Sequence, residues 1–148
     1  MTLPTNRWFA TTFILAGFVA GSFVTATMMR PATARAASNQ VFEMRTYTTL
    51  EGRLPALEKR FRDHTMTLFE KHGMKNVGYW IPQDAPKHAN TLIYIISHES
   101  REGAKAAWSA FGKDPEWKKV SDASQVDGKI VQSVESVFMD PTDYSPVK

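Results

Sequence analysis

Four short stretches of the chain combine β-branched and aromatic residues, which fit the pleated, half-buried surface of a β-strand. We therefore predict strands at Val41 to Thr49, Met74 to Ile81, Thr91 to His98 and Ile130 to Met139. The first stretch alternates with period two, so that Glu43, Arg45 and Tyr47 share one face, and Phe42 and Met44 share the other. Two prolines lie between the second and third stretches, and this short connection predicts a hairpin.

Helical periodicity appears in two other regions. Pro55 suits the first turn of a helix that we expect to end at His72, just before Gly73. One stripe of this helix contains Leu54, Leu57, Phe61, His64, Leu68 and His72. Ser100 is placed to cap a second helix, from Arg101 to about Phe111. Asp114 and Pro115 then predict a short helix that ends before Ser121.

The resulting order is strand, helix, strand, strand, helix, strand. This order predicts an α+β fold, the ferredoxin-like βαββαβ domain, with an antiparallel sheet and both helical regions on one face. One face of such a sheet stays uncovered. Two uncovered faces paired across a twofold axis would close a barrel, so we expect a homodimer and a dimeric α/β barrel.

A hydrophobic leader precedes this domain. The run from Trp8 to Met29 is uncharged and long enough to span a bilayer, and Ala34-Arg35-Ala36 has the A-x-A pattern of a signal-peptide cleavage site. We therefore divide the chain into a signal peptide or membrane anchor (1–36) and a folded domain (41–148). The expected location is the periplasm or cell envelope after cleavage near Ala36. The alternative is a domain anchored in the membrane by residues 8–29.

The net charge of +3 belongs to the leader. Beyond Ala36 the chain has as many basic as acidic residues, so the domain lacks the basic surface that nucleic-acid binding requires, and we expect no nucleic-acid partner. The chain has no cysteine, which excludes disulfides and thiolate chemistry. It also lacks the nucleophile-elbow, phosphate-loop, dinucleotide and H-E-x-x-H motifs, and the histidines have no metal-ligand spacing, so we predict no metal site.

His64 is the candidate catalytic residue, because its place in an apolar stripe predicts partial burial beside a pocket between helix and sheet. There it would serve as a proton donor or a haem ligand. The alternative is a core histidine that is bonded to a backbone carbonyl or a neighbouring side chain.

Five further side chains are candidate ligand-binding residues. Glu43, Arg45 and Tyr47 form a polar cluster if their face lines the barrel. The alternative is a network at the dimer interface, with Arg45 paired to an acidic residue such as Glu135. Trp80 and Trp108 would add an aromatic wall for a planar ligand, or else simply pack in the core.

Several segments together resemble the NIPSNAP family, in the right order over nearly all of Val41 to Pro146. They are Phe42-Glu43-Met44-Arg45-Thr46-Tyr47, Phe69-Glu70-Lys71-His72-Gly73-Met74, Asn76-Val77-Gly78-Tyr79-Trp80, Ala106-Ala107-Trp108 with Phe111, and Asp114-Pro115-Glu116-Trp117. The resemblance implies the dimeric α/β-barrel fold, in a group that also holds small monooxygenases and haem-binding relatives. It does not identify a reaction.

Two function classes follow. The first is a NIPSNAP-domain homodimer, exported or membrane-anchored, that binds a protein partner or a small hydrophobic ligand. The second is a small-molecule enzyme of the oxygenase or isomerase type, either cofactor-poor or haem-dependent.

Overall fold

The computed structural model describes residues 40–147, and their centre is a four-stranded antiparallel sheet. Its strands are β1 (Val41–Thr49), β2 (Lys75–Trp80), β3 (Thr91–His98) and β4 (Val131–Met139), in the spatial order β2-β3-β1-β4. This is the ferredoxin-like order, so the predicted fold class is confirmed. The predicted hairpin is confirmed too, since β2 pairs directly with β3 and a 3-10 turn (Lys87–Ala89) lies in their connection.

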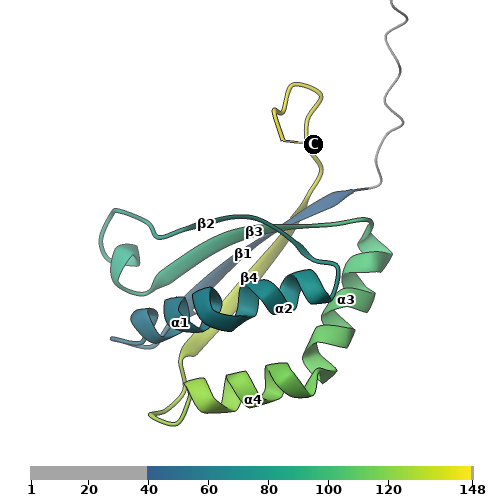
Figure 1. Ribbon diagram of the computed structural model, residues 1–148. Coiled ribbons are helices and arrows are strands. Elements are labelled where there is room, and N and C mark those ends of the chain that lie inside the picture. Colours follow the sequence, from purple (N-terminus) through teal and green to yellow (C-terminus); the bar gives the residue numbers. More distant parts are fainter. Residues whose placement is uncertain (1–39, 148) are drawn as a thin grey trace, which may run out of the picture. The chain divides into compact units, whose positions relative to one another are not determined.

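The helices α1 to α4 lie on one side of the sheet (Figure 1). They are α1 (Leu54–Arg60), α2 (Met66–Lys71), α3 (Arg101–Lys113) and α4 (Pro115–Ser124). Both predicted caps are present: the Ser100 hydroxyl accepts from the backbone N–H of Gly103, and Asp114 accepts from that of Glu116. The prediction that α4 ends before Ser121 is wrong, because Trp117 and Val120 pack on the core and the helix continues one more turn along that face.

A π-helical turn (Phe61–Thr65) joins α1 to α2. Its defining hydrogen bond runs from the N–H of Met66 to the carbonyl of Phe61, five residues back. A π turn adds one residue to an α-helix, so the positions that follow rotate relative to the stripe. Thr65 therefore takes the buried position that an uninterrupted helix would give to His64, and His64 is exposed. The prediction that His64 is partly buried in the apolar stripe is wrong for this reason.

The core lies between the sheet and the helices and is built largely from aromatic rings. Phe61 and Phe69 from the first helical region contact Tyr94 at the centre of β3, with ring centroids 5.1 and 5.9 Å apart. Leu57, Met74 and other side chains fill the space around these rings, and several are completely inaccessible to solvent. Burying one such side chain stabilises the fold by about 1.5–3 kcal/mol.

Among the residues that the structure describes, no helix covers the opposite face of the sheet. Strand alternation and register place apolar side chains on this open face: Phe42, Met44, Val77, Trp80, Ile93, Ile95, Val137 and Met139. Trp80 and Val137 are about half exposed (50% and 51%), which is unusual for large apolar side chains on a soluble domain. The segment after β4 lines one end of this face with Pro141 and Val147.

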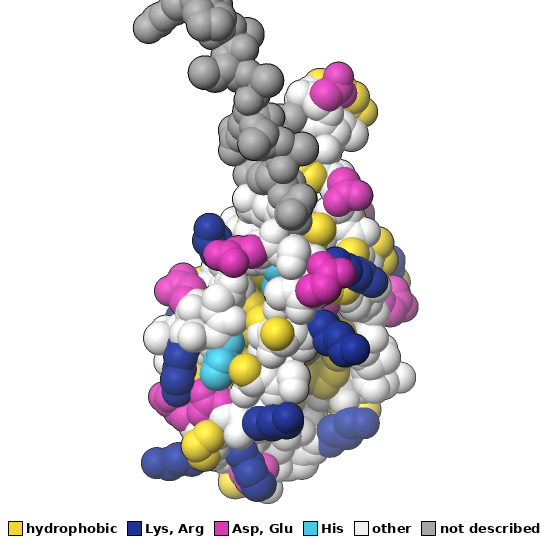
Figure 2. All heavy atoms as spheres, turned by 90° about the vertical axis from the view of Figure 1, so that its right-hand side faces the viewer, with side chains coloured by type: hydrophobic (Ala, Val, Ile, Leu, Met, Phe, Trp, Pro, Cys, Tyr) yellow, Lys and Arg dark blue, Asp and Glu magenta, His cyan; other side chains and the backbone are white. Residues whose placement is uncertain are grey.

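The surface on the α3 side has a different character. Figure 2 shows Lys and Arg interspersed there with Asp and Glu, and hydrophobic side chains scattered among them. Within residues 40–147, no helix is long and apolar enough to cross a membrane. The predicted leader, with its candidate membrane segment 8–29, lies outside the described residues.

We expect deletion of His64 to leave the domain folded, with a free energy of unfolding within about 1 kcal/mol of the wild type. The deletion converts the π turn into a regular α-helical turn, which keeps Phe61, Thr65 and Phe69 on one face. Deletion of Lys105 from α3, which is exposed but has no π turn beside it, would rotate Ala104 against Phe111 and cost about 3–5 kcal/mol. Urea unfolding measures the free energy of unfolding of the two deletion variants. An equal loss of stability in both would contradict the prediction.

Candidate functional site

The side chains of Glu43, Arg45 and Tyr47 do share one face of β1, but that face is the one covered by the helices. Glu43 bonds to Trp108 of α3, and Tyr47 contacts Phe61 of the π turn. The expectation that this face is the uncovered one, lining a barrel between subunits, is therefore wrong. Alternation along a strand separates two faces, but only the packing of the helices decides which of them is covered.

The Glu43 carboxylate is the centre of a buried hydrogen-bond network. Its Oε1 accepts from Arg45 Nη1 at 2.7 Å and from Ser136 Oγ at 2.6 Å. Its Oε2 accepts from Trp108 Nε1 at 2.7 Å and from His98 Nε2 at 2.9 Å. The side chains of Glu43 and His98 are each only 1% exposed. The network thus joins β1, β3, β4 and α3 through one carboxylate.

Opposing effects act on the pKa of Glu43. Burial raises the pKa, but the four hydrogen bonds to the charged form outweigh burial and lower the pKa from 4.5 to about 2. The carboxylate therefore stays ionised at neutral pH and has its acceptor positions occupied. A carboxylate held in this way is suited to positioning its neighbours rather than to taking up a proton.

Arg45 pairs with Glu43, and the predicted pairing with Glu135 is wrong. Glu135 lies opposite Thr46 in the strand register, so it belongs to the open face. The guanidinium of Arg45 lies over the ring of Trp108, with its Cζ 4.2 Å from the ring centroid, and its Cζ is 5.7 Å from the ring centroid of Tyr47. The structure therefore brings Glu43, Arg45, Tyr47 and Trp108 together, as one cluster between sheet and helices.

Trp80 does not belong to this cluster, because it extends from the open face. Its ring lies over Gly78, where a Cβ atom would be only 2.5 Å from Cη2 of the indole. Together with Phe42 and Met139 it lines an apolar pocket of about 550 Å³ beside the C-terminal segment. The two candidate tryptophans thus lie on opposite sides of the sheet.

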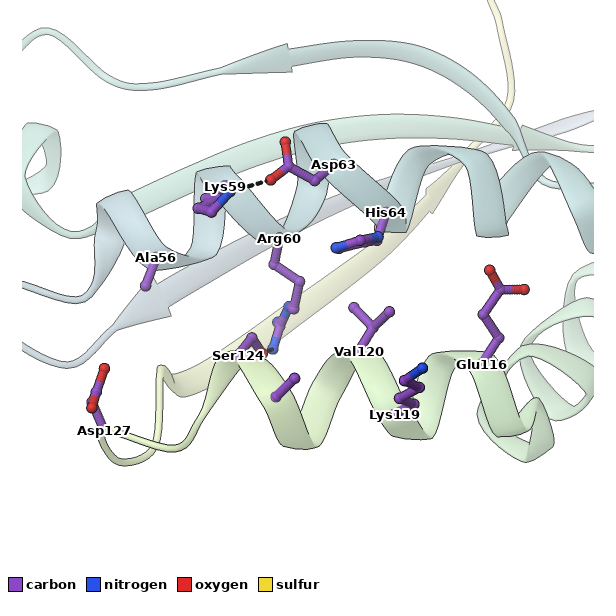
Figure 3. A pocket seen from close by; sticks show the side chains of 11 residues that line it. Ala56, Lys59, Arg60, Asp63, His64, Glu116, Lys119, Val120, Ser124 and Asp127 are labelled. Atoms are coloured by element: carbon purple, nitrogen blue, oxygen red, sulfur yellow. Dashed lines mark hydrogen bonds and ion pairs between the residues drawn. The ribbon is translucent and has the colours of Figure 1, made fainter.

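A separate cleft of about 570 Å³ lies between α1 and α4 (Figure 3). His64 and Arg60 extend from the first helical region toward α4, and Val120 faces them from the other wall. Charged side chains dominate the rest of the lining, which comprises Ala56, Lys59, Asp63, Glu116, Lys119, Ala123, Ser124 and Asp127. His64 therefore lines the cleft, although its side chain is exposed and is not part of the core.

Arg60 is a candidate that sequence reasoning missed. It is only 6% exposed, and its guanidinium crosses the cleft to Ser124, where Nη1 donates a long hydrogen bond of 3.3 Å. The ring of Trp117 lies 5.2 Å from its Cζ. An arginine at the end of a charged helical segment is normally expected in solvent, so the sequence contains no clear signal for this burial.

Two histidine–carboxylate pairs lie elsewhere in the domain. His98 bonds Glu43, as described above, and His72 Nε2 lies 2.7 Å from Asp114 Oδ2, which also receives Lys71 Nζ at 2.8 Å. The bonds of His72 and Lys71 to Asp114 tie the end of α2 to the start of α4. Among the described residues, no group of three or more histidine, aspartate or glutamate side chains is arranged to hold a metal ion.

We expect the replacement Glu43→Gln to lower the free energy of unfolding by about 3 kcal/mol at pH 7, because it leaves Arg45 and His98 buried without their carboxylate. The lowered pKa of Glu43 means that its contribution is complete above pH 4.5 and is lost as the pH falls toward 2. The difference between wild type and Glu43→Gln should therefore shrink in urea unfolding at pH 3. Glu51→Gln, an exposed control in the turn after β1, should change stability by less than about 0.5 kcal/mol. A stability difference between wild type and Glu43→Gln that is the same at pH 7 and pH 3 would contradict the role of the ionised Glu43 carboxylate.

Comparison with known proteins agrees with the fold and the resemblance. The family model for NIPSNAP matches residues 42–146. No curated protein sequence matches the chain.

Among solved structures, a NIPSNAP family protein of unknown function from Agrobacterium tumefaciens is 23% identical, with a TM-score of 0.65. The match covers 75% of this chain and 96% of that one. A NIPSNAP-like domain protein from Burkholderia xenovorans is 15% identical with a TM-score of 0.64, and 74% and 90% of the two chains are covered. Because the family model spans most of the chain, this protein belongs to the NIPSNAP family.

Proposed function

We propose that this protein is a homodimeric small-molecule-binding protein whose ligand occupies the cleft between α1 and α4. The observation that carries the proposal is the cleft itself, which has about 570 Å³ and is walled by two helices. This volume lies within the range of small-molecule sites, which commonly combine apolar walls with a few convergent polar groups. Val120 and Ala56 supply apolar surface here, and Arg60, His64 and Ser124 supply polar groups.

The proposed dimer rests on the open face of the sheet. Val77, Trp80 and Val137 are 39–51% exposed there, and they share this face with Met44 and Ile95. A second copy of the same face would cover these side chains in a twofold interface, which is the commonest symmetry of soluble oligomers. Because the cleft lies on the other side of the sheet, dimerisation would leave the cleft open.

The cleft does not fit a haem. A porphyrin needs apolar surface against both faces of its ring, whereas six of the eleven lining side chains are charged and His64 lies among them. His64 is therefore not proposed as a haem ligand. The cofactor-poor enzyme of the oxygenase or isomerase type stays a prediction, with His64 as its candidate proton donor.

We further propose that the leader directs the domain out of the cytoplasm and is removed near Ala36. The A-x-A pattern at Ala34 to Ala36 supports cleavage, and the uncharged run from Trp8 to Met29 supports membrane insertion. An uncleaved anchor in residues 8–29 is the competing outcome.

We expect Val137→Arg to convert the dimer into a monomer, because it places a charge on the open face, in the edge strand β4, without touching the core. Val126→Arg is the matched control, since Val126 is 79% exposed and lies outside the open face. Light scattering after size-exclusion chromatography measures the mass of each variant. A monomeric wild type, or a Val137→Arg variant that stays dimeric, would contradict the proposed interface.

Native mass spectrometry of the protein purified from its own host tests the ligand and the leader together. The expected species is a dimer of chains that begin near Ala37, each with an extra non-covalent mass. Val120→Trp fills the cleft and should abolish the extra mass, whereas Val126→Trp should retain it. An extra mass that survives Val120→Trp would exclude the cleft as its site. A chain that still contains Met1 would favour the anchor.

A further inference from the structure

Two buried hydrogen-bond donors, Nε of Arg45 and Nε of Arg60, have no partner among the residues that the structure describes. A buried donor without an acceptor costs the free energy of its lost hydration, and native proteins contain few of them. Nε of Arg60 lies beside a cleft, so an acceptor group that enters the cleft could bind it.

Of these two arginines, only Arg60 reaches the cleft between α1 and α4. It extends from the end of α1, is buried, and lines the cleft, whereas Arg45 is not among the lining residues. The guanidinium of Arg60 is therefore the group that a ligand in the cleft would meet.

The two arginines differ in how their charge is balanced. Arg45 is neutralised by Glu43 at 2.7 Å. Arg60 has no carboxylate within 4 Å among the residues that the structure describes, although it is buried. Two of the acidic side chains of the cleft are already paired with lysines, Asp63 with Lys59 and Glu116 with Lys71. The buried charge of Arg60 is therefore left without a paired carboxylate among the described residues.

We propose that Arg60 binds the carboxylate of an organic monoanion that enters through the cleft. This inference rests on the proposed function and specifies its ligand class. The planar guanidinium offers two parallel N–H groups that match a carboxylate, and a charge-assisted pair of this kind is strong when it is desolvated. Trp117 lies beside the guanidinium and holds its position, and Ser124 forms only a long bond that a ligand would replace.

The rest of the cleft limits the body of the ligand. Behind Arg60 the walls present Ala56, Val120 and Ala123, which suit a short hydrocarbon portion. The exposed charges of Lys119 and Asp127 lie at the rim and would face solvent. A medium-chain carboxylate has the required shape, with one charge at the inner end and an apolar body behind it.

The alternative is that Arg60 has only a structural role, covering Trp117 with its side chain. Octanoate and octanamide distinguish the two, because they have the same chain and differ in charge. Calorimetric titration of the full domain should give binding of octanoate at least about tenfold tighter than of octanamide. Arg60→Gln should weaken octanoate binding by about tenfold or more, and Arg60→Lys, which keeps the charge but not the fork, should weaken it less.

Arg62→Gln is the matched control, since it removes an exposed positive charge two residues away and outside the cleft. It should bind octanoate like the wild type. Thermal unfolding by circular dichroism tests whether each variant is folded. If Arg60→Gln does not fold, the difference in affinity between octanoate and octanamide for the wild type alone tests the carboxylate inference. A purely structural Arg60 would change the melting temperature but not the preference for the carboxylate.

Different outcomes overturn different claims. If both probes bind equally and Val120→Trp abolishes both, the cleft is a ligand site and the carboxylate inference is wrong. If octanoate binds and Val120→Trp leaves its affinity unchanged, the proposed cleft itself is wrong. If neither octanoate nor the butyrate to decanoate series binds, the carboxylate inference is overturned, while the extra mass measured by native mass spectrometry still tests the cleft.

Discussion

The hydrogen-bonded carboxylate of Glu43 is the interaction on which the rest of this domain depends. It accepts donors from its own strand, from β3, from β4 and from α3, so that three strands and a helix meet at one buried charge. A buried charge is tolerated only when it is paired and fully hydrogen-bonded, and here both oxygens meet two donors each. The position of α3 above the sheet, and with it the stacking of Trp108 on Arg45, follows from this constraint.

This arrangement gives the sheet an unusual distribution of polarity. The covered face combines aromatic rings with Glu43 and Arg45, whereas the open face has large apolar side chains such as Trp80 and Val137. A polar network under the helices leaves donors available to a ligand, and an apolar open face favours contact with a second protein surface. The proposed ligand site and the proposed dimer thus use opposite sides of one sheet, which lets both form in the same molecule.

Most of the fold was predictable because local signals agree with one another. The strand at Val41–Thr49 and the strand at Thr91–His98 occur at the predicted residues, and Ser100 and Asp114 cap their helices as their residue types indicate. The candidate site was predictable only in part. Glu43, Arg45, Tyr47 and Trp108 were identified and do cluster, but Arg60 was missed, and His64 was placed in the core although it is exposed.

The sequence by itself determined the order of the elements, their approximate limits, the family, and the two-sided character of β1, because each of these depends on local periodicity or on residue identity along the chain. The tertiary structure decided which side of the sheet the helices cover, that Glu43 and not Glu135 pairs with Arg45, and that Arg60 turns inward. It also decided the exposure of His64, since a single extra residue in the π turn rotates that side chain out of the stripe. These outcomes depend on contacts between residues far apart in the sequence or on a one-residue change of helical register, and residue spacing alone specifies neither.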